Sequence, residues 1–70
     1  PNQDAIIMSG VVVEVLPNTL FKVECEQGHH IMAHPSGKLR MAKIKIILGD
    51  KVDVATSPYD LSKGRIVYRW

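Results

Sequence analysis

The segment that decides between the candidate folds of this chain reads His34-Pro35-Ser36-Gly37-Lys38-Leu39-Arg40-Met41-Ala42-Lys43-Ile44-Lys45-Ile46. Ser36 suits the start of a helix because its hydroxyl can accept a hydrogen bond from a free amide of the first turn. Residues 38–43 contain no helix breaker, and Pro35 has no amide hydrogen for a sheet, so it is expected to end the preceding strand. The segment therefore predicts a helix of one to two turns between two strands.

The longest predicted strand lies N-terminal to this segment, at residues 6–16. Its Val and Ile content favours extended structure. A glycine inside it, Gly10, permits a bulge or sharp bend, which would let one long strand pair with two neighbours. Four apolar residues share one parity and are expected to form its buried face: Ile7, Val11, Val13 and Val15.

Two more strands are expected before the helix. Residues 20–26 alternate cleanly, which places Phe21, Val23 and Cys25 on an inner face and charged side chains on the outer face. A tight hairpin at residues 27–28 uses the freedom of glycine to adopt a positive φ. The third strand is then expected at residues 29–34.

Two strands are expected after the helix. The fourth covers residues 51–56, with Val52 and Val54 inward, and residues 57–64 are rich in turn formers and are expected to be a loop. The fifth covers residues 64–70. Parity places its side chains on two faces: Ile66 and Tyr68 on one, Arg65 and Arg69 on the other.

Five short strands with a helix between the third and fourth predict an all-β fold, a Greek-key OB barrel. An SH3-like barrel also has five strands, but its helical turn usually precedes the final strand. At 70 residues the chain is expected to form a single domain, residues 1–70, with a thin core.

Charge is distributed unevenly along the chain. Residues 1–30 hold one lysine and four acids, a net charge of −3, whereas residues 31–70 hold eight bases and three acids, a net charge of +5. No acid occurs from Ala33 through Leu48, where four bases fall within eight residues. The C-terminal part is therefore expected to attract a polyanion.

Several other functions lack the residues they need. No serine lies in a nucleophile motif, no pair of acids accompanies a histidine on one predicted face, and no glycine-rich phosphate loop is present, so an enzyme is not expected. Cys25 and the histidines 29, 30 and 34 are close in sequence, but their parity argues against convergence on a metal, and no cofactor is expected.

The sequence also bears on where the protein works. The single cysteine cannot form an internal disulfide, which favours a reducing cytoplasm. Apolar runs are too short to span a bilayer and no leader is evident, so a soluble protein without a membrane partner is expected.

The remaining feature that points to a function is a set of Lys and Arg side chains that can form a groove for a phosphodiester backbone. Lys38, Arg40, Lys43 and Lys45 project from the predicted helix and the chain after it, and Arg65 and Arg69 from the last strand. Alternatively, these charged side chains form a surface that serves only solubility, although such surfaces usually carry both positive and negative charges.

Aromatic residues bear on the kind of nucleic acid. Phe21 and Tyr68 share parity with apolar neighbours and are expected in the core. Few exposed aromatic side chains therefore remain to stack on the nucleobases of a single strand. This favours a structured RNA recognised through backbone charge and shape. Tyr59 and His34 are added to the candidate contacts, because they can stack or donate hydrogen bonds.

Several motifs resemble bacterial translation initiation factor one across nearly the whole chain. They are Leu16-Pro17-Asn18-Thr19-Leu20-Phe21-Lys22-Val23-Glu24, Gly28-His29, Ala33-His34, Ser36-Gly37-Lys38-Leu39-Arg40, Gly49-Asp50-Lys51-Val52 and Ser57-Pro58-Tyr59-Asp60-Leu61-Ser62-Lys63-Gly64-Arg65-Ile66-Val67-Tyr68-Arg69. The chain departs from that pattern at Pro35, where an apolar residue is usual, and at Lys45, where arginine is usual.

The resemblance implies a non-catalytic S1-type OB barrel in the aminoacyl-tRNA site of the small ribosomal subunit. It implies contacts with rRNA and a small-subunit ribosomal protein, cooperation with other initiation factors, and a monomer when free. Lys38, Arg40 and Lys45 would be the loop contacts, and Lys63, Arg65 and Arg69 would support the grip on the RNA backbone.

Two alternatives stay open from the residues. A cold-shock-like RNA chaperone would need exposed aromatic residues. A protein-interaction module without RNA would use the acidic face of the second strand, at Glu24 and Glu26.

Overall fold

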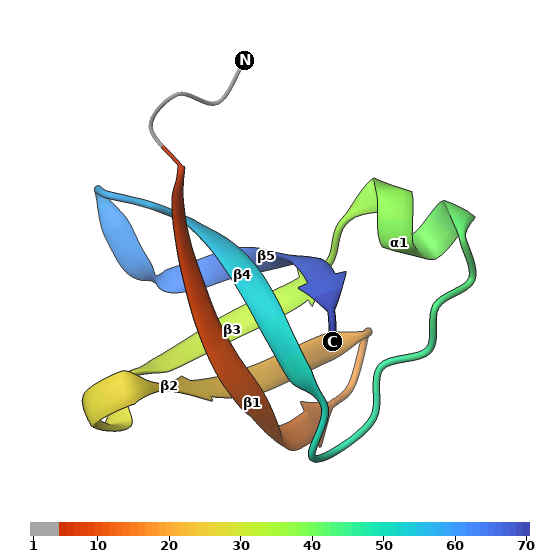
Figure 1. The fold of residues 1–70 in the computed structure, drawn as a ribbon, viewed down its shortest axis with the longest axis horizontal. Helices are drawn as coiled ribbons and strands as arrows, with labels where there is room; N and C mark the ends of the chain where they lie inside the picture. Colours follow the sequence, from red (N-terminus) through yellow and green to blue (C-terminus); the bar gives the residue numbers. More distant parts are fainter. Residues whose placement is uncertain (1–4) are drawn as a thin grey trace.

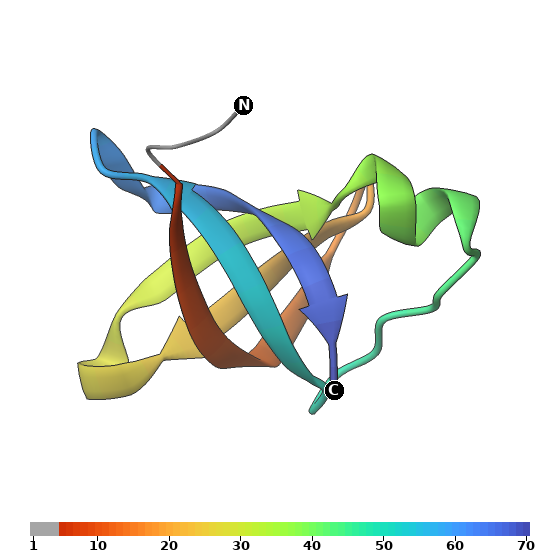
Figure 2. The same cartoon turned by 45° about the horizontal axis from the view of Figure 1, so that its top comes forward.

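Five strands close into a barrel in the computed structural model, which describes residues 5–70 (Figures 1 and 2). The order around the barrel is β1-β2-β3-β5-β4; β3 and β5 pair in parallel, and the other neighbours are antiparallel. The elements are β1 Ile6–Leu16, β2 Leu20–Cys25, a 3₁₀ turn at Glu26–Gly28, β3 His30–Pro35, α1 Gly37–Met41, β4 Lys51–Ser57 and β5 Asp60–Arg69. The predicted all-β barrel with a helix between β3 and β4 is confirmed, and it is an OB-type barrel.

The core is small and almost entirely aliphatic. Phe21, Val23 and Cys25 of β2 are buried, which confirms the inner face predicted from the alternation of residues 20–26. The largest side chains that are fully buried come from all five strands: Ile31, Ile66, Val12, Val23, Val52 and Val54.

The buried face of β1 is the opposite of the predicted one. Ile7 and Val15 are 57% and 53% exposed, and Val11 and Val13 also face solvent, whereas Val12 is buried. Pairing with β4 explains this result, because the inward-facing Val52 and Val54 lie opposite Gly10 and Met8. Val and Ile on the outer face therefore reflect strand preference rather than burial.

Gly10 lets β1 serve two neighbours, as predicted. The strand pairs with β4 through residues 6–11 and with β2 through residues 10–16, and its register with β2 shifts between Val12 and Glu14. A Cβ atom at Gly10 would lie 2.6 Å from the Glu24 carbonyl oxygen and 2.7 Å from Val23 Cγ1. Glycine is thus required where the bent strand passes close to β2.

The hairpin forms at its predicted position, residues 27–28, and another turn joins β1 to β2. Asn18 has a φ of 63° and Thr19 a φ of 55° between β1 and β2, and Gly28 has a φ of 74° between β2 and β3. The strand β3 continues one residue further than expected, because Pro35 pairs with Ile66 and the next amide, that of Ser36, donates to the Ile66 carbonyl at 2.9 Å.

The expected loop at residues 57–64 is mostly strand. β5 begins at Asp60, so only a short turn separates it from β4. The Asp60 carboxylate accepts hydrogen bonds from the Ser62 amide at 3.0 Å and the Ser62 hydroxyl at 2.5 Å. Polar residues that usually mark loops here stabilise the start of a hairpin strand.

The two predicted faces of β5 are wrong beyond Ile66. Ile66 is buried opposite Val54, but the next pairs are Asp53 with Tyr68 and Val52 with Arg69. Val67 is therefore an extra residue that reverses the parity of the strand. As a result Tyr68 lies outside the barrel, and Arg69 lies on the side of Val52 rather than on the side of Arg65.

No helix in residues 5–70 is long and apolar enough to cross a membrane.

Candidate nucleic-acid interface

The helix α1 carries two of the predicted RNA-binding cations, Lys38 and Arg40. The Ser36 hydroxyl accepts a hydrogen bond from the Leu39 amide at 3.3 Å, so the predicted N-cap is present. Leu39 is buried and anchors the helix to the barrel, whereas Lys38 and Arg40 are exposed. One buried leucine therefore fixes two cations at the surface.

Arg40 is partly restrained. Its Nε donates to the Pro35 carbonyl oxygen at 3.4 Å, and no other hydrogen bond joins its guanidinium to residues 5–70. The two terminal nitrogens remain available as a planar fork, which suits phosphate oxygens or base edges.

The end of α1 turns the chain so that Lys43 faces outward. The Lys43 amide donates to the Arg40 carbonyl at 3.0 Å and the Ile44 amide to the Leu39 carbonyl at 3.1 Å. These are the two hydrogen bonds of a Schellman motif, in which the residue after the C-cap is left-handed and usually glycine. Here that residue is Lys43, with a φ of 55°, so a cation occupies a position where its backbone conformation is unfavourable.

Arg69 contacts the backbone of the connection between α1 and β4. Its Nη1 donates to the Lys45 carbonyl oxygen at 2.9 Å and lies 4.0 Å from Asp50 Oδ2. The end of β5 is thereby joined to the connection between α1 and β4. Arg69 supports the backbone that carries the exposed Lys45 side chain.

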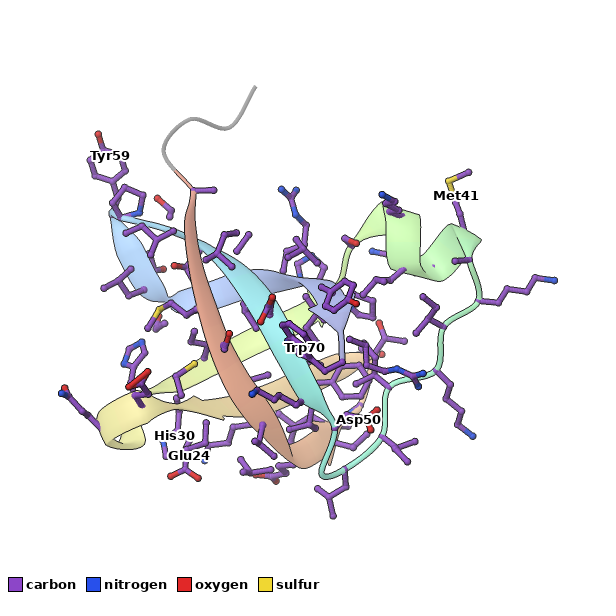
Figure 3. All side chains as sticks on the ribbon, in the orientation of Figure 1. Glu24, His30, Met41, Asp50, Tyr59 and Trp70 are labelled. Carbon is purple, nitrogen blue, oxygen red and sulfur yellow. The ribbon has the colours of Figure 1, made fainter. Side chains whose placement is uncertain are left out.

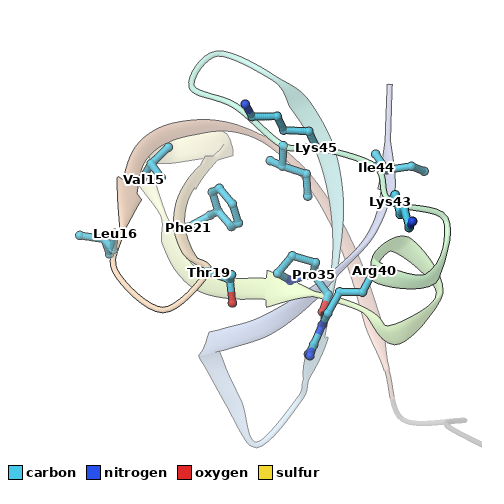
Figure 4. A pocket seen from close by; sticks show the side chains of 10 residues that line it. Val15, Leu16, Thr19, Phe21, Pro35, Arg40, Lys43, Ile44 and Lys45 are labelled. Carbon is cyan, nitrogen blue, oxygen red and sulfur yellow. Dashed lines mark hydrogen bonds between the residues drawn. The ribbon is translucent and has the colours of Figure 1, made fainter.

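An open groove of about 680 Å³ lies between this connection and the β1–β2 turn. Figure 4 looks into it, with Phe21 and Pro35 turned toward the opening and Arg40 running beside Pro35. Three of the predicted bases belong to an otherwise mostly apolar lining, which consists of Val15, Leu16, Thr19, Phe21, Pro35, Arg40, Lys43, Ile44, Lys45 and Ile46. The sequence did not predict the groove, because its two sides are distant in the chain.

Other predicted residues lie beside this region. His34 of β3 pairs with Arg65 of β5, and both are exposed. They lie next to the start of α1, because Ser36 bonds to Ile66. Lys63 is exposed further along β5, opposite Met32.

Tyr59 is not brought to this region. It is 90% exposed in the turn between β4 and β5, and its amide donates to the Ser57 hydroxyl at 3.1 Å. Figure 3 shows Tyr59 on the opposite side of the molecule from Met41 of α1. A surface that includes α1 therefore does not include Tyr59.

The acidic residues of the N-terminal half occupy different strands. Glu14 lies on β1 and Glu24 on β2, and Glu24 Oε2 is 3.8 Å from His30 Nε2 (Figure 3). The segment of residues 33–48 forms the end of β3, α1 and the connection toward β4, and it contains no acid. The uneven charge of the sequence is thus an uneven charge in space.

Cys25 and the histidines do not converge. No group of three or more His, Cys, Asp or Glu residues within residues 5–70 is placed to hold a metal ion. Cys25 is buried, and burial, with a smaller contribution from the nearby Glu26 charge, raises the pKa of its thiol. It is held as a neutral thiol in the barrel wall.

Sequence reasoning missed two exposed aromatic residues. Tyr68 is 52% exposed and Trp70 is 65% exposed, because the extra residue Val67 turns this end of β5 outward. No pattern of hydrophobicity reports a bulge of one residue, so parity alone could not locate them.

Comparison with known proteins gives consistent results. A family model described as translation initiation factor 1A / IF-1 matches residues 1–70. The solution structure of translation initiation factor IF-1 from the Wolbachia endosymbiont strain TRS of Brugia malayi has a TM-score of 0.83 and 41% sequence identity, over 99% of this chain and 82% of that chain. The crystal structure of YjeQ from Thermotoga maritima has a TM-score of 0.75 and 30% identity, over 93% of this chain but 23% of that chain.

The family model spans the whole sequence, and the likeness to the Wolbachia protein covers 99% of this chain. Since the fold, the sequence identity and the extent of the match agree, the chain belongs to the translation initiation factor IF-1 family, whose members are translation factors and not enzymes.

Proposed function

We propose that this protein occupies the aminoacyl-tRNA (A) site of the small ribosomal subunit during initiation. The observation that carries the proposal is the basic segment, defined as Lys38, Arg40, Lys43 and Lys45. These four exposed cations lie on α1 and the chain after it, with no acid between Ala33 and Leu48. Membership of a family that works on the ribosome supports rRNA as the polyanion.

The basic segment binds rRNA by two complementary means. Lysine side chains neutralise phosphates and release their counterions, roughly 0.7 to 0.9 per contact. Arg40 offers its two terminal nitrogens to phosphate oxygens or base edges at the mouth of the groove. His34, Arg65 and Lys63 extend the positive surface along β3 and β5.

The remainder of the barrel acts as a steric block. The whole structure, α1 included, extends over 28 × 27 × 22 Å, and a rigid body of this size in the A site excludes an elongator tRNA while the initiator is selected. The protein acts as a single RNA-binding domain and as a monomer in the cytoplasm, beside a small-subunit ribosomal protein and the other initiation factors.

Binding to purified small subunits across a salt series tests this proposal. Arg40→Ala is expected to weaken binding by about 1 to 3 kcal/mol, or roughly 5- to 150-fold. Lys22→Ala is the matched control, since it removes one charge from β2, outside the basic segment, and should change the affinity less than about 2-fold.

Three outcomes would contradict the proposal. Equal losses for Arg40→Ala and Lys22→Ala would mean that only net charge matters. Equal binding to an unstructured RNA of the same length would favour the chaperone alternative. Absence of any RNA binding would favour the protein-interaction alternative.

Lys43→Gly should separate stability from binding. Glycine relieves the left-handed strain at φ 55°, so the free energy of unfolding should rise by about 0.5 to 1 kcal/mol, while the loss of a cation weakens subunit binding. Urea unfolding and the binding assay measure the two effects. Lys43→Ala, which loses the charge but keeps the strain, should weaken binding without the gain in stability; equal stabilities of the two variants would refute the strain argument.

A further inference from the structure

The outer face of β4 and β5 carries an aromatic pair that the proposed function does not use. Tyr68 and Trp70 are two residues apart and lie on the same side of the strand, past the extra residue Val67. They are 52% and 65% exposed. Figure 3 shows Trp70 near the end of β5 and away from Met41 of α1.

The two rings support one another. Their centroids are 5.1 Å apart and their planes make an angle of 82°, an edge-to-face arrangement. Such a contact is favourable because the positive edge of one ring meets the negative face of the other. The pair is therefore ordered without being buried in the core.

Hydrogen bonds fix the indole further. Trp70 Nε1 donates to Asp53 Oδ1 at 3.0 Å, and the Ser9 hydroxyl donates to the same oxygen at 2.6 Å. The Trp70 backbone amide donates to the Lys51 carbonyl at 2.8 Å. The polar atom of the ring is thus satisfied by the protein, and a ligand meets an apolar aromatic surface that is already in place, which lowers the entropy cost of binding.

The local charges suit a ligand with a π-face and a negative group. Lys51 Nζ lies 5.6 Å from the centroid of the Trp70 ring. The nearby Asp53 carboxylate is occupied by the Ser9 and Trp70 donors, and these hydrogen bonds, in that order, lower its pKa. The Asp53 carboxylate is therefore occupied in holding the indole, and the Lys51 ammonium lies over one face of the Trp70 ring.

We propose that Tyr68, Trp70 and Lys51 form a stacking site for an unpaired nucleobase of single-stranded RNA. The base stacks on the exposed aromatic surface, and the Lys51 ammonium pairs with its phosphate. The site is distinct from the basic segment, and it supplies the exposed aromatic residues that the sequence was expected to lack. It would add a contact with unpaired RNA outside the surface of α1.

Trp70 is the only tryptophan in the chain, so its fluorescence reports on this site directly. The intact protein is titrated with a short oligouridylate and with an abasic oligonucleotide of equal length, which keeps the phosphates and removes the bases. Saturable quenching by the oligouridylate and none by the abasic probe is the expected result. No quenching, or equal quenching by both probes, would overturn the proposal.

Variants of the tyrosine separate stacking from folding. Tyr68→Leu is expected to weaken the affinity for oligouridylate about 5- to 150-fold, and Tyr68→Phe to retain it, because only the aromatic face is needed. Tyr59→Ala is the matched control, since it removes an exposed tyrosine from the turn before β5, whereas Tyr68 lies near the other end of that strand. Equal losses for Tyr68→Leu and Tyr68→Phe, or a comparable loss for Tyr59→Ala, would overturn the proposal.

Discussion

Replacing Lys38, Arg40, Lys43 and Lys45 together by glutamine is expected to weaken binding to small ribosomal subunits roughly 10³-fold at moderate salt. All four side chains are exposed, so the barrel should keep its stability to within about 0.5 kcal/mol. The magnitude of the slope of log affinity against log salt concentration should fall by about 3 to 4, because each phosphate that is no longer contacted keeps its counterions. Equilibrium binding across a salt series, beside urea unfolding, measures both effects.

A charge-restored variant is the control. Adding Glu14→Gln, Glu24→Gln, Glu26→Gln and Asp60→Asn returns the formal net charge to the original +2, with acids removed from β1, β2, the turn after it and β5. Binding should stay weak, because the contacts and not the overall charge are lost. Recovery of affinity in this variant would show that the protein binds RNA by its net charge, without a defined basic segment.

Gly64→Ala is expected to destabilise the barrel by about 2 to 3 kcal/mol, a large part of the stability of a domain this small. Gly64 lies where β5 closes the barrel, paired with Ala33 of β3 and Thr56 of β4. A Cβ atom there would lie 2.6 Å from Val54 Cγ1 and 2.8 Å from the Ala55 carbonyl oxygen. Relief requires movement of a backbone that belongs to the sheet. Urea unfolding followed by circular dichroism measures the loss.

Gly37→Ala is the matched control for this substitution. No atom lies within 4 Å of the position that its Cβ would take, and its φ is not positive. Alanine in the first turn of α1 favours the helix, so stability should be unchanged or rise by up to about 1 kcal/mol. Equal losses in the two variants would show that the close approach at Gly64 is not the cause.

The buried face of a strand was predictable where apolar and charged residues alternate in the sequence. Phe21, Val23 and Cys25 alternate with charged residues, so only one face of β2 can be buried. β1 lacks this contrast, since apolar residues occupy both parities at Ile7 and Met8, and Val11 and Val12. Pairing with β4 decides its inner face, and that pairing joins strands about 45 residues apart.

The candidate site was predictable where its residues are close in sequence. Bases that are close in sequence, from Lys38 to Lys45, are also close in the structure, because one short helix and its connection carry them. Tyr59 lies in the turn before β5, and Arg69 lies at the end of β5, past the bulge at Val67, which leaves no trace in the pattern of residues. The structure therefore separates Tyr59 from α1 and uses Arg69 to hold the Lys45 backbone.

The position of β5 in the barrel also determines when the protein can fold during its synthesis. β5 lies between β3 and β4, so while it is still inside the ribosomal exit tunnel, the earlier strands can form only an open sheet. Both β3 and β4 then present unpaired edges, which are open to association with other chains. The barrel can therefore close only after β5 has left the tunnel, and this one strand covers both edges that would otherwise expose the nascent chain to aggregation.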